Sequence, residues 1–285
     1  MPIKSILVPL ADSEGAGEVL DAAFALAGTF GAHVNALHLR ADPTQALGDF
    51  AGETISPALV DQVLTAAEKR AETTATKTRK AFDAAAKKAK AATGRTAAKG
   101  ALTASYDEVT GMSDYVVEER GRLNDLVVVR RARDARDAGI RVVAETALME
   151  TGRPALLVPP KLPAKVGSNV AIAWNGSREA ARAVGAAMPF LMRATSVTAV
   201  SVGDSKLIDQ KGLVEYLARH GVKAKAVVVK PGADTGKAIV NAAVKAGANL
   251  LVMGAFTHSR VRELIFGGVT EHALENSRLP VLMIH

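Results

Sequence analysis

The strongest constraint on this chain of 285 residues is that one sequence pattern occurs twice. Three pairs of segments match: residues 5–13 with 169–177, 125–129 with 249–253, and 145–158 with 271–284. The second and third pairs have nearly the same offset, 124 and 126 residues. One unit has therefore been duplicated, and each copy should fold in the same way.

Short apolar runs alternate with helical patterns of about 12–18 residues in both copies. In the first copy the runs lie near residues 4–9, 33–39, 97–102, 125–130 and 154–158; in the second they lie near 169–174, 195–202, 223–230, 249–254 and 280–284. Continuous Val, Ile, Leu and Ala runs are typical of strands buried on both faces, as in parallel sheets. The fold class expected is α/β, with two tandem, doubly wound, five-stranded parallel sheets, one in each repeat.

The predicted domains are residues 1–160 and 167–285, separated by a proline-containing linker. The first domain carries an expansion at about residues 42–95, in which a loop precedes a long helix that begins near Pro57. The corresponding helix of the second copy should cover only residues 206–220. The last strands of the two copies, near 154–158 and 280–284, should pair with each other, because a bare apolar edge invites aggregation.

The net charge of +7 resides in one segment, since residues 68–99 hold ten Lys or Arg and three Asp or Glu. Phe82 is the one aromatic residue there, and it lies on the apolar face of the predicted helix. A nucleic-acid site would need stacking aromatics or a recognition motif beside the charge. We therefore interpret the segment as a solvated helix face and do not expect nucleic acid as a partner.

Several classes of function are excluded by what the sequence lacks. Without cysteine there is no thiolate nucleophile and no Cys-ligated zinc or iron–sulfur cluster. The sequence also has no Walker pattern, no G-x-S-x-G elbow and no HxxxH pair. We see neither a signal peptide nor an apolar stretch long enough to span a membrane, so the expected location is the cytoplasm.

Ligands of open parallel sheets bind at the carboxyl ends of the strands. In the second copy, that edge should contain the turn Asn175-Gly176-Ser177, the end of a strand at Val202, and the long loop that follows Gly254. Ser177 should also cap the following helix. The pair Gly267-Gly268 precedes a helical pattern, whose free N–H groups could hold an anion.

The same loop carries a family resemblance. A strand ending in V-M-G, the loop H-S-R-x-R-E, the run G-G-V-T-E-H-A-L and a last strand after R-L-P-V-L resemble the universal stress protein family. The two-copy layout resembles its tandem-domain members and covers essentially the whole chain. The resemblance implies a Rossmann-like, adenine-nucleotide-binding scaffold and a role in the stress response.

Nucleotide-binding members of that family carry Gly, two residues, Gly, nine residues, then Gly followed by Ser or Thr. The corresponding positions are Gly254, Thr257, Gly267 and Gly268, of which two match in kind, and Asn175 is nearest to the family's Asp. Thr257 stands where the family has a glycine, and a β-branched residue at positive φ costs about 1–2 kcal/mol. We therefore expect ATP or AMP to bind weakly. The predicted ligand site comprises Asn175, Gly176, Ser177, Val202, Gly254, Phe256, His258, Ser259, Arg260, Gly267, Gly268, Val269 and Thr270.

The first copy lacks these features. Arg130-Arg131 replaces Gly254-Ala255, and the following loop is two residues shorter. The arginines could clamp a phosphate, but we expect them to pair with Asp134 and Asp137 at the surface. No nucleotide is therefore expected in the first copy.

The function expected is a non-catalytic cytoplasmic regulator of the stress response. It should pair its two domains as an intramolecular pseudo-dimer and form a homodimer of whole chains. A weak ATPase on the same scaffold is the alternative, and a structural module with two decayed sites is a third interpretation. The sequence indicates no metal, no catalytic residue and no membrane association, and it does not identify a protein partner.

Overall fold

The computed structural model describes residues 2–50, 55–94, 101–133, 137–163, 165–203, 209–255, 272 and 277–285. The elements of the first repeat are β1 (Ser5–Leu10), α1 (Ala16–Phe30), β2 (His33–Arg40), the 3-10 helix η1 (Pro43–Phe50), α2 (Pro57–Ala89), β3 (Ala92–Thr93), β4 (Thr103–Thr110), α3 (Ser113–Gly121), β5 (Leu126–Arg130), α4 (Ala138–Met149) and β6 (Ala155–Val158). Those of the second are β7 (Asn169–Ala173), α5 (Arg178–Leu191), β8 (Ser196–Val202), α6 (Gln210–Arg219), β9 (Ala224–Val229), α7 (Thr235–Lys245), β10 (Leu250–Gly254) and β11 (Val281–Ile284).

The described strands form one sheet, in the order β3-β4-β2-β1-β5-β6-β11-β10-β7-β8-β9. All pairs are parallel except β6 with β11, which run antiparallel with Leu156 opposite Leu282. The expectation of two separate sheets is therefore wrong. The apolar last strands meet, as their sequence predicts, and their hydrogen bonds join the two parallel sheets into one mixed sheet of 11 strands.

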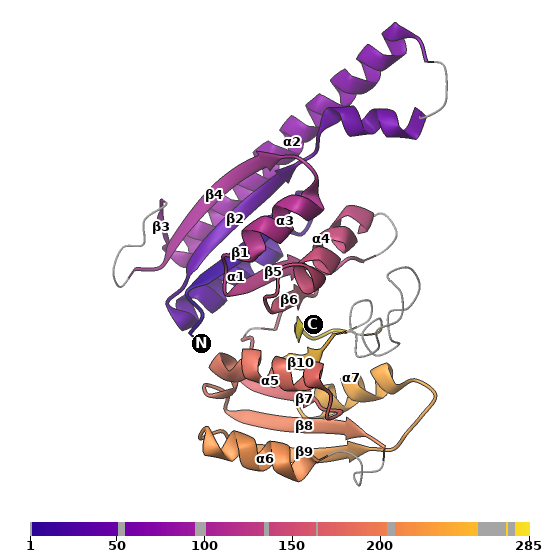
Figure 1. Ribbon diagram of the computed structural model, residues 1–285. Coiled ribbons are helices and arrows are strands. Elements are labelled where there is room, and N and C mark those ends of the chain that lie inside the picture. The colour runs from indigo at the N-terminus through magenta and orange to yellow at the C-terminus, as the bar shows by residue number, and fades with distance from the viewer. Residues whose placement is uncertain are drawn as a thin grey trace.

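Helices cover both faces of this sheet (Figure 1). Buried side chains of α1, α2, α5 and α6 share one apolar cluster, whereas those of α3, α4 and α7 share the other. Each face is thus continuous across the two repeats. Phe30 and Phe190 meet edge to face at that junction, with ring centroids 4.8 Å apart.

The third strand of the first repeat differs from its prediction. It is Thr103–Thr110 rather than 97–102, of which residues 97–100 lie outside the described part of the chain. Its sequence, TASYDEVT, has no apolar run, because several of its side chains are only partly covered. The corresponding helix of the second repeat, expected at 206–220, is Gln210–Arg219, and residues 206–208 are not described.

The long helix is present as predicted and begins at Pro57, with Ser56 accepting a hydrogen bond from Leu59 N. Its fully buried residues start at Ala71, so only its second half packs on the sheet. The first half projects from the body together with η1 (Figure 1). None of the helices in the described part of the chain has the length and apolar character needed to cross a bilayer.

Candidate functional site

The turn after β7 has the conformation expected at the carboxyl edge of the second repeat. Asn175 Oδ1 accepts a hydrogen bond from Ser177 N at 3.1 Å, and Gly176 has a φ of 75°. Ser177 Oγ accepts from Ala180 N at 3.1 Å and caps α5. The three residues therefore lie together, and their first task is to start this helix.

Trp174, the one tryptophan of the chain, precedes this turn. Its carbonyl accepts a 2.7 Å hydrogen bond from Ser201 Oγ, next to Val202 at the end of β8. The indole Nε1 is buried without a hydrogen-bond partner in the described structure. The Trp174 side chain packs against the apolar cluster that α5 and α6 share.

Gly254 has a packing role that the sequence does not reveal. A Cβ atom at this position would lie 2.6 Å from the backbone carbon of Glu179 and 2.7 Å from Ala180 N. The glycine thus lets β10 approach the first turn of α5, where we had expected a phosphate to approach. Glu179 is itself buried, and its hydrogen bond from Arg178 holds its pKa below the usual range. The Glu179 carboxylate is thus ionised and paired with Arg178, and the backbone beside Gly254 is occupied by the start of α5.

The other predicted ligand residues lie outside the described residues. They are Phe256, His258, Ser259, Arg260, Gly267, Gly268, Val269 and Thr270. At the margin of this region, His272 Nδ1 lies 3.6 Å from Asp234 Oδ2, and Asp234 caps α7 by accepting from Lys237 N. Within the described residues, no cluster of three or more His, Asp or Glu side chains could hold a metal ion.

The carboxyl edge of the first repeat is filled by Arg130. Its guanidinium donates two 2.9 Å hydrogen bonds to the carboxylate of Asp137 and one of 2.9 Å to Asp12 Oδ2. The side chain is only 6% exposed. The prediction that this arginine pairs at the surface is therefore wrong: Asp137 is the correct partner, but the pair is buried.

The two carboxylates that bind Arg130 differ in how their pKa values respond to it. Burial alone would lower the pKa of Arg130, but Asp137 and Asp12 together raise it. The bidentate bond from Arg130 lowers the pKa of Asp137, whereas burial raises the pKa of Asp12 in spite of the same guanidinium. Asp137 is therefore the principal counter-ion.

Gly15 makes room for this arginine. It begins α1 with a φ of 72°, and a Cβ there would collide with Arg130 Cδ. The sequence offered a signal for this arrangement, since an arginine ends the otherwise apolar strand LVVVR. Asp137 is close in sequence and was predicted as a partner, whereas Asp12 was not, because it is 118 residues distant.

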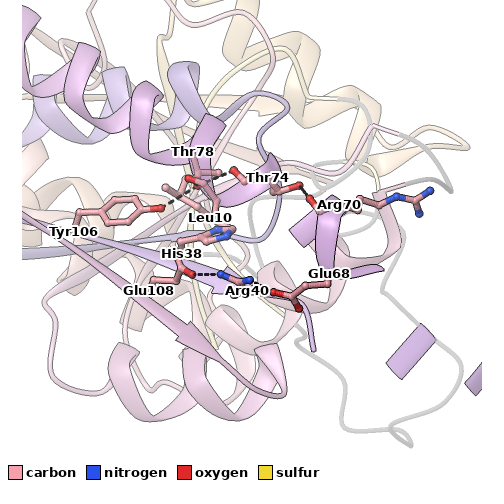
Figure 2. A network of polar contacts seen from close by, with 10 residues as sticks. Leu10, His38, Arg40, Glu68, Arg70, Thr74, Thr78, Tyr106 and Glu108 are labelled. Atoms are coloured by element: carbon pink, nitrogen blue, oxygen red, sulfur yellow. Dashed lines mark hydrogen bonds and ion pairs between the residues drawn. The ribbon is translucent and has the colours of Figure 1, made fainter. Parts of the chain in front are cut away.

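A polar network fixes the long helix above the same repeat (Figure 2). His38 is buried, and its Nδ1 atom lies 3.0 Å from the carbonyl oxygen of Leu10. Its Nε2 atom is buried without a hydrogen-bond partner in the described structure. Arg40 binds Glu68 of α2 and Glu108 of β4. Ser201 makes the contact corresponding to that of His38 in the second repeat, since each bonds the carbonyl at the end of the first strand.

Comparisons with known proteins agree with this architecture. Residues 168–285 match the universal stress protein family. A universal stress protein from Archaeoglobus fulgidus DSM 4304 has a TM-score of 0.67 at 15% identity, with 98% of this chain and 97% of that chain covered. A putative universal stress protein from Pseudomonas aeruginosa UCBPP-PA14 has a TM-score of 0.55 at 15% identity, with 99% and 93% covered.

A universal stress protein solved in complex with cAMP is 18% identical, has a TM-score of 0.37, and covers 56% of this chain and 100% of its own. No curated protein matches the sequence at a significant level. The TM-scores of the two whole-length structures establish the fold of the chain, and the family match covers its C-terminal repeat. Residues 168–285 of this chain belong to the universal stress protein family, and the whole chain has the fold of its tandem-domain structures.

Proposed function

We propose that this protein is a non-catalytic regulator of the stress response that binds adenine nucleotides weakly, in its second repeat only. The observation that carries the asymmetry is the buried guanidinium of Arg130, which occupies the carboxyl edge of the first repeat. A ligand there would have to displace three hydrogen bonds to carboxylates, and each carboxylate left behind would repel a phosphate.

In the second repeat, the turn Asn175-Gly176-Ser177 and the end of β8 would accommodate the base and ribose. The phosphates would be held by the loop after Gly254, at Gly267 to Thr270. Contacts at a helix N-terminus contribute only about 0.3–2 kcal/mol each. Because Gly254 packs directly against the first turn of α5, where a phosphate would have to approach, we expect affinity to be low.

Calorimetric titration with ATP, AMP and cAMP tests this proposal. We expect one weak site per chain, lost in Gly267→Val and retained in Gly139→Val. The control substitution lies near the start of α4 in the first repeat, where a Cβ would meet nothing within 4 Å. Two sites per chain, or equal binding by wild type and Gly267→Val, would contradict the assignment.

Fluorescence of Trp174 gives an independent measurement, because no other tryptophan contributes to the signal. Saturable quenching by ATP, absent in Gly267→Val, is expected. Phosphate release should stay at the background rate throughout. Release well above background that Gly267→Val abolishes would indicate an ATPase instead.

The proposed partners are other copies of the chain and a regulatory protein. Pairing of whole chains into a homodimer stays a prediction, which sedimentation velocity over a range of concentrations would test. A monomer at all concentrations would refute it.

A further inference from the structure

In the part of the chain that the structure describes, strand β9 ends the sheet and has no strand on its outer side (Figure 1). Its burial differs from that of the inner strands, because four consecutive residues, 225–228, are exposed. Val227 and Val228 are 39% and 49% exposed, although their side chains project from opposite faces of the sheet. A strand that is apolar and open in this way is a surface on which a further strand can pair.

The main-chain groups of β9 are divided between its two sides. The carbonyl of Val229 accepts a hydrogen bond from Gly203 N at 3.0 Å, so the main-chain groups of Val229 face β8. Because these groups alternate along a strand, those of Ala226 and Val228 face the outer side. An added strand would therefore form hydrogen bonds with two residues of β9 without disturbing its pairing with β8.

Three lysines give this edge a positive charge. Lys223, Lys225 and Lys230 are exposed, and none of them is paired with a carboxylate in the described structure. Helices α6 and α7 pack beside β9, but the carboxylates at their starts, Asp209 and Asp234, each cap their own helix. A carboxylate of a partner would therefore meet unpaired cations along β9.

The two faces of β9 differ in character. Ala224 packs on the apolar cluster that α5 and α6 share, so Ala226 and Val228 project from that face. Lys225 projects from the opposite face, which α7 covers farther from the edge. An added strand with acidic side chains on the α7 side and apolar side chains on the α6 side would match both faces.

The charge of β9 favours an acidic segment over a second copy of the chain. Pairing of two β9 edges would bring together three lysines from each copy, and lysine on an edge strand opposes pairing of this kind. An acidic strand reverses the effect, since opposite charges on neighbouring strands attract each other.

We propose that the outer edge of β9 (Ala224–Val229) accepts an extended acidic peptide segment as an additional strand. Ala226 and Val228 provide the main-chain hydrogen bonds. A glutamate or aspartate of the segment pairs with Lys225, and one of its apolar residues contacts Val228. The surface is the side of a strand and not the carboxyl end of the sheet, so binding does not require nucleotide.

The first test measures binding of a fluorescent peptide, acetyl-Glu-Val-Glu-Val-Glu-Val-amide, to the full chain by anisotropy, without nucleotide. The Lys-Val counterpart is the charge control and should bind roughly tenfold more weakly. Two isomers, N-methylated on the glutamates or on the valines, are the backbone controls, and the one that lacks the donors facing β9 should bind roughly tenfold more weakly than the other. No binding of the parent peptide, equal binding of its Lys-Val counterpart, or equal binding of the two isomers would overturn the proposal.

The second test locates the site. Lys225→Glu should weaken binding of the acidic peptide by about fivefold, whereas Lys77→Glu, the same charge change on α2 of the first repeat, should not. Ala226→Pro should also weaken binding, because proline removes an N–H that faces outward and leaves the hydrogen bonds to β8 in place. Wild-type affinity in both Lys225→Glu and Ala226→Pro would place the peptide elsewhere and exclude the proposal.

Amide exchange separates this surface from self-association. The amides of Ala226 and Val228 should exchange rapidly in the free chain and slowly once the peptide is added. Slow exchange before addition, abolished by dilution, would show that β9 pairs with a second copy and would exclude the acidic partner. Because the peptide is tested without nucleotide, its failure to bind leaves the calorimetric test of the nucleotide site unaffected, and the two proposals fail separately.

Discussion

Arg130 fills the carboxyl edge of the first repeat, where its guanidinium bonds the carboxylates of Asp137 and Asp12. Replacing it with methionine would leave Asp137 and Asp12 without their shared counter-ion. We expect the free energy of unfolding to fall by about 3 kcal/mol, the lower end of the range for a buried pair, because Asp12 is 38% exposed. Urea denaturation measures the change.

The matched control is Arg133→Met. Arg133 pairs with Glu14, which is 72% exposed, so its loss should cost about 0–1 kcal/mol. Equal effects of the two substitutions would show that the Arg130 pair contributes no more than a surface ion pair.

His33 should make stability depend on pH. Burial lowers the pKa of its imidazole, although Asn35 opposes the shift. A histidine with a lowered folded pKa contributes stability that is fully present above its unfolded pKa of about 6.5 and is lost as the pH falls through the folded pKa. The melting temperature should therefore fall more between about pH 7.5 and 5.5 in wild type than in His33→Gln. A parallel decline in both proteins would exclude this contribution.

The two halves of helix α2 have different energetic roles. Phe82 is 1% exposed and contacts Phe24 and Tyr106, so Phe82→Ala should cost about 3–5 kcal/mol. Leu59 lies in the projecting half and is 38% exposed, so Leu59→Ala should cost less than about 1 kcal/mol. Thermal denaturation of both variants checks the contrast, and similar losses would mean that the projecting half is as strongly anchored as the rest.

Elements with one dominant signal could be predicted from sequence. β5 is a run of buried residues, and α2 begins with Ser before Pro, so both were located within a residue or two. β4 was missed because its polar side chains make hydrogen bonds at the sheet edge, so it has no apolar run. The sequence predicted Asp137 as a partner of Arg130, but it missed Asp12 and the burial of the pair, since sequence pattern alone does not show which distant carboxylates a fold brings together.

The molecule should unfold as one cooperative unit. β6 pairs with β11, and Phe30 of the first repeat packs on Phe190 of the second. Because Trp174 belongs to the second repeat, its fluorescence follows that half, whereas far-UV circular dichroism follows both. The two signals should give coincident urea transitions, as two-state unfolding requires. Separate midpoints would show that the halves unfold independently.

The antiparallel contact between β6 and β11 limits the length of the array. The last strand of each repeat forms its edge hydrogen bonds with the last strand of the other repeat. This is the self-complementary geometry of a closed two-fold pair. A third repeat would find no equivalent strand left to join, unlike in a solenoid, where every unit offers a fresh surface to the next. The same geometry reverses the strand direction between the halves, so their carboxyl edges open on opposite sides of the molecule. The duplicated fold therefore has two carboxyl edges on opposite sides of the molecule, and Arg130 fills the one in the first repeat.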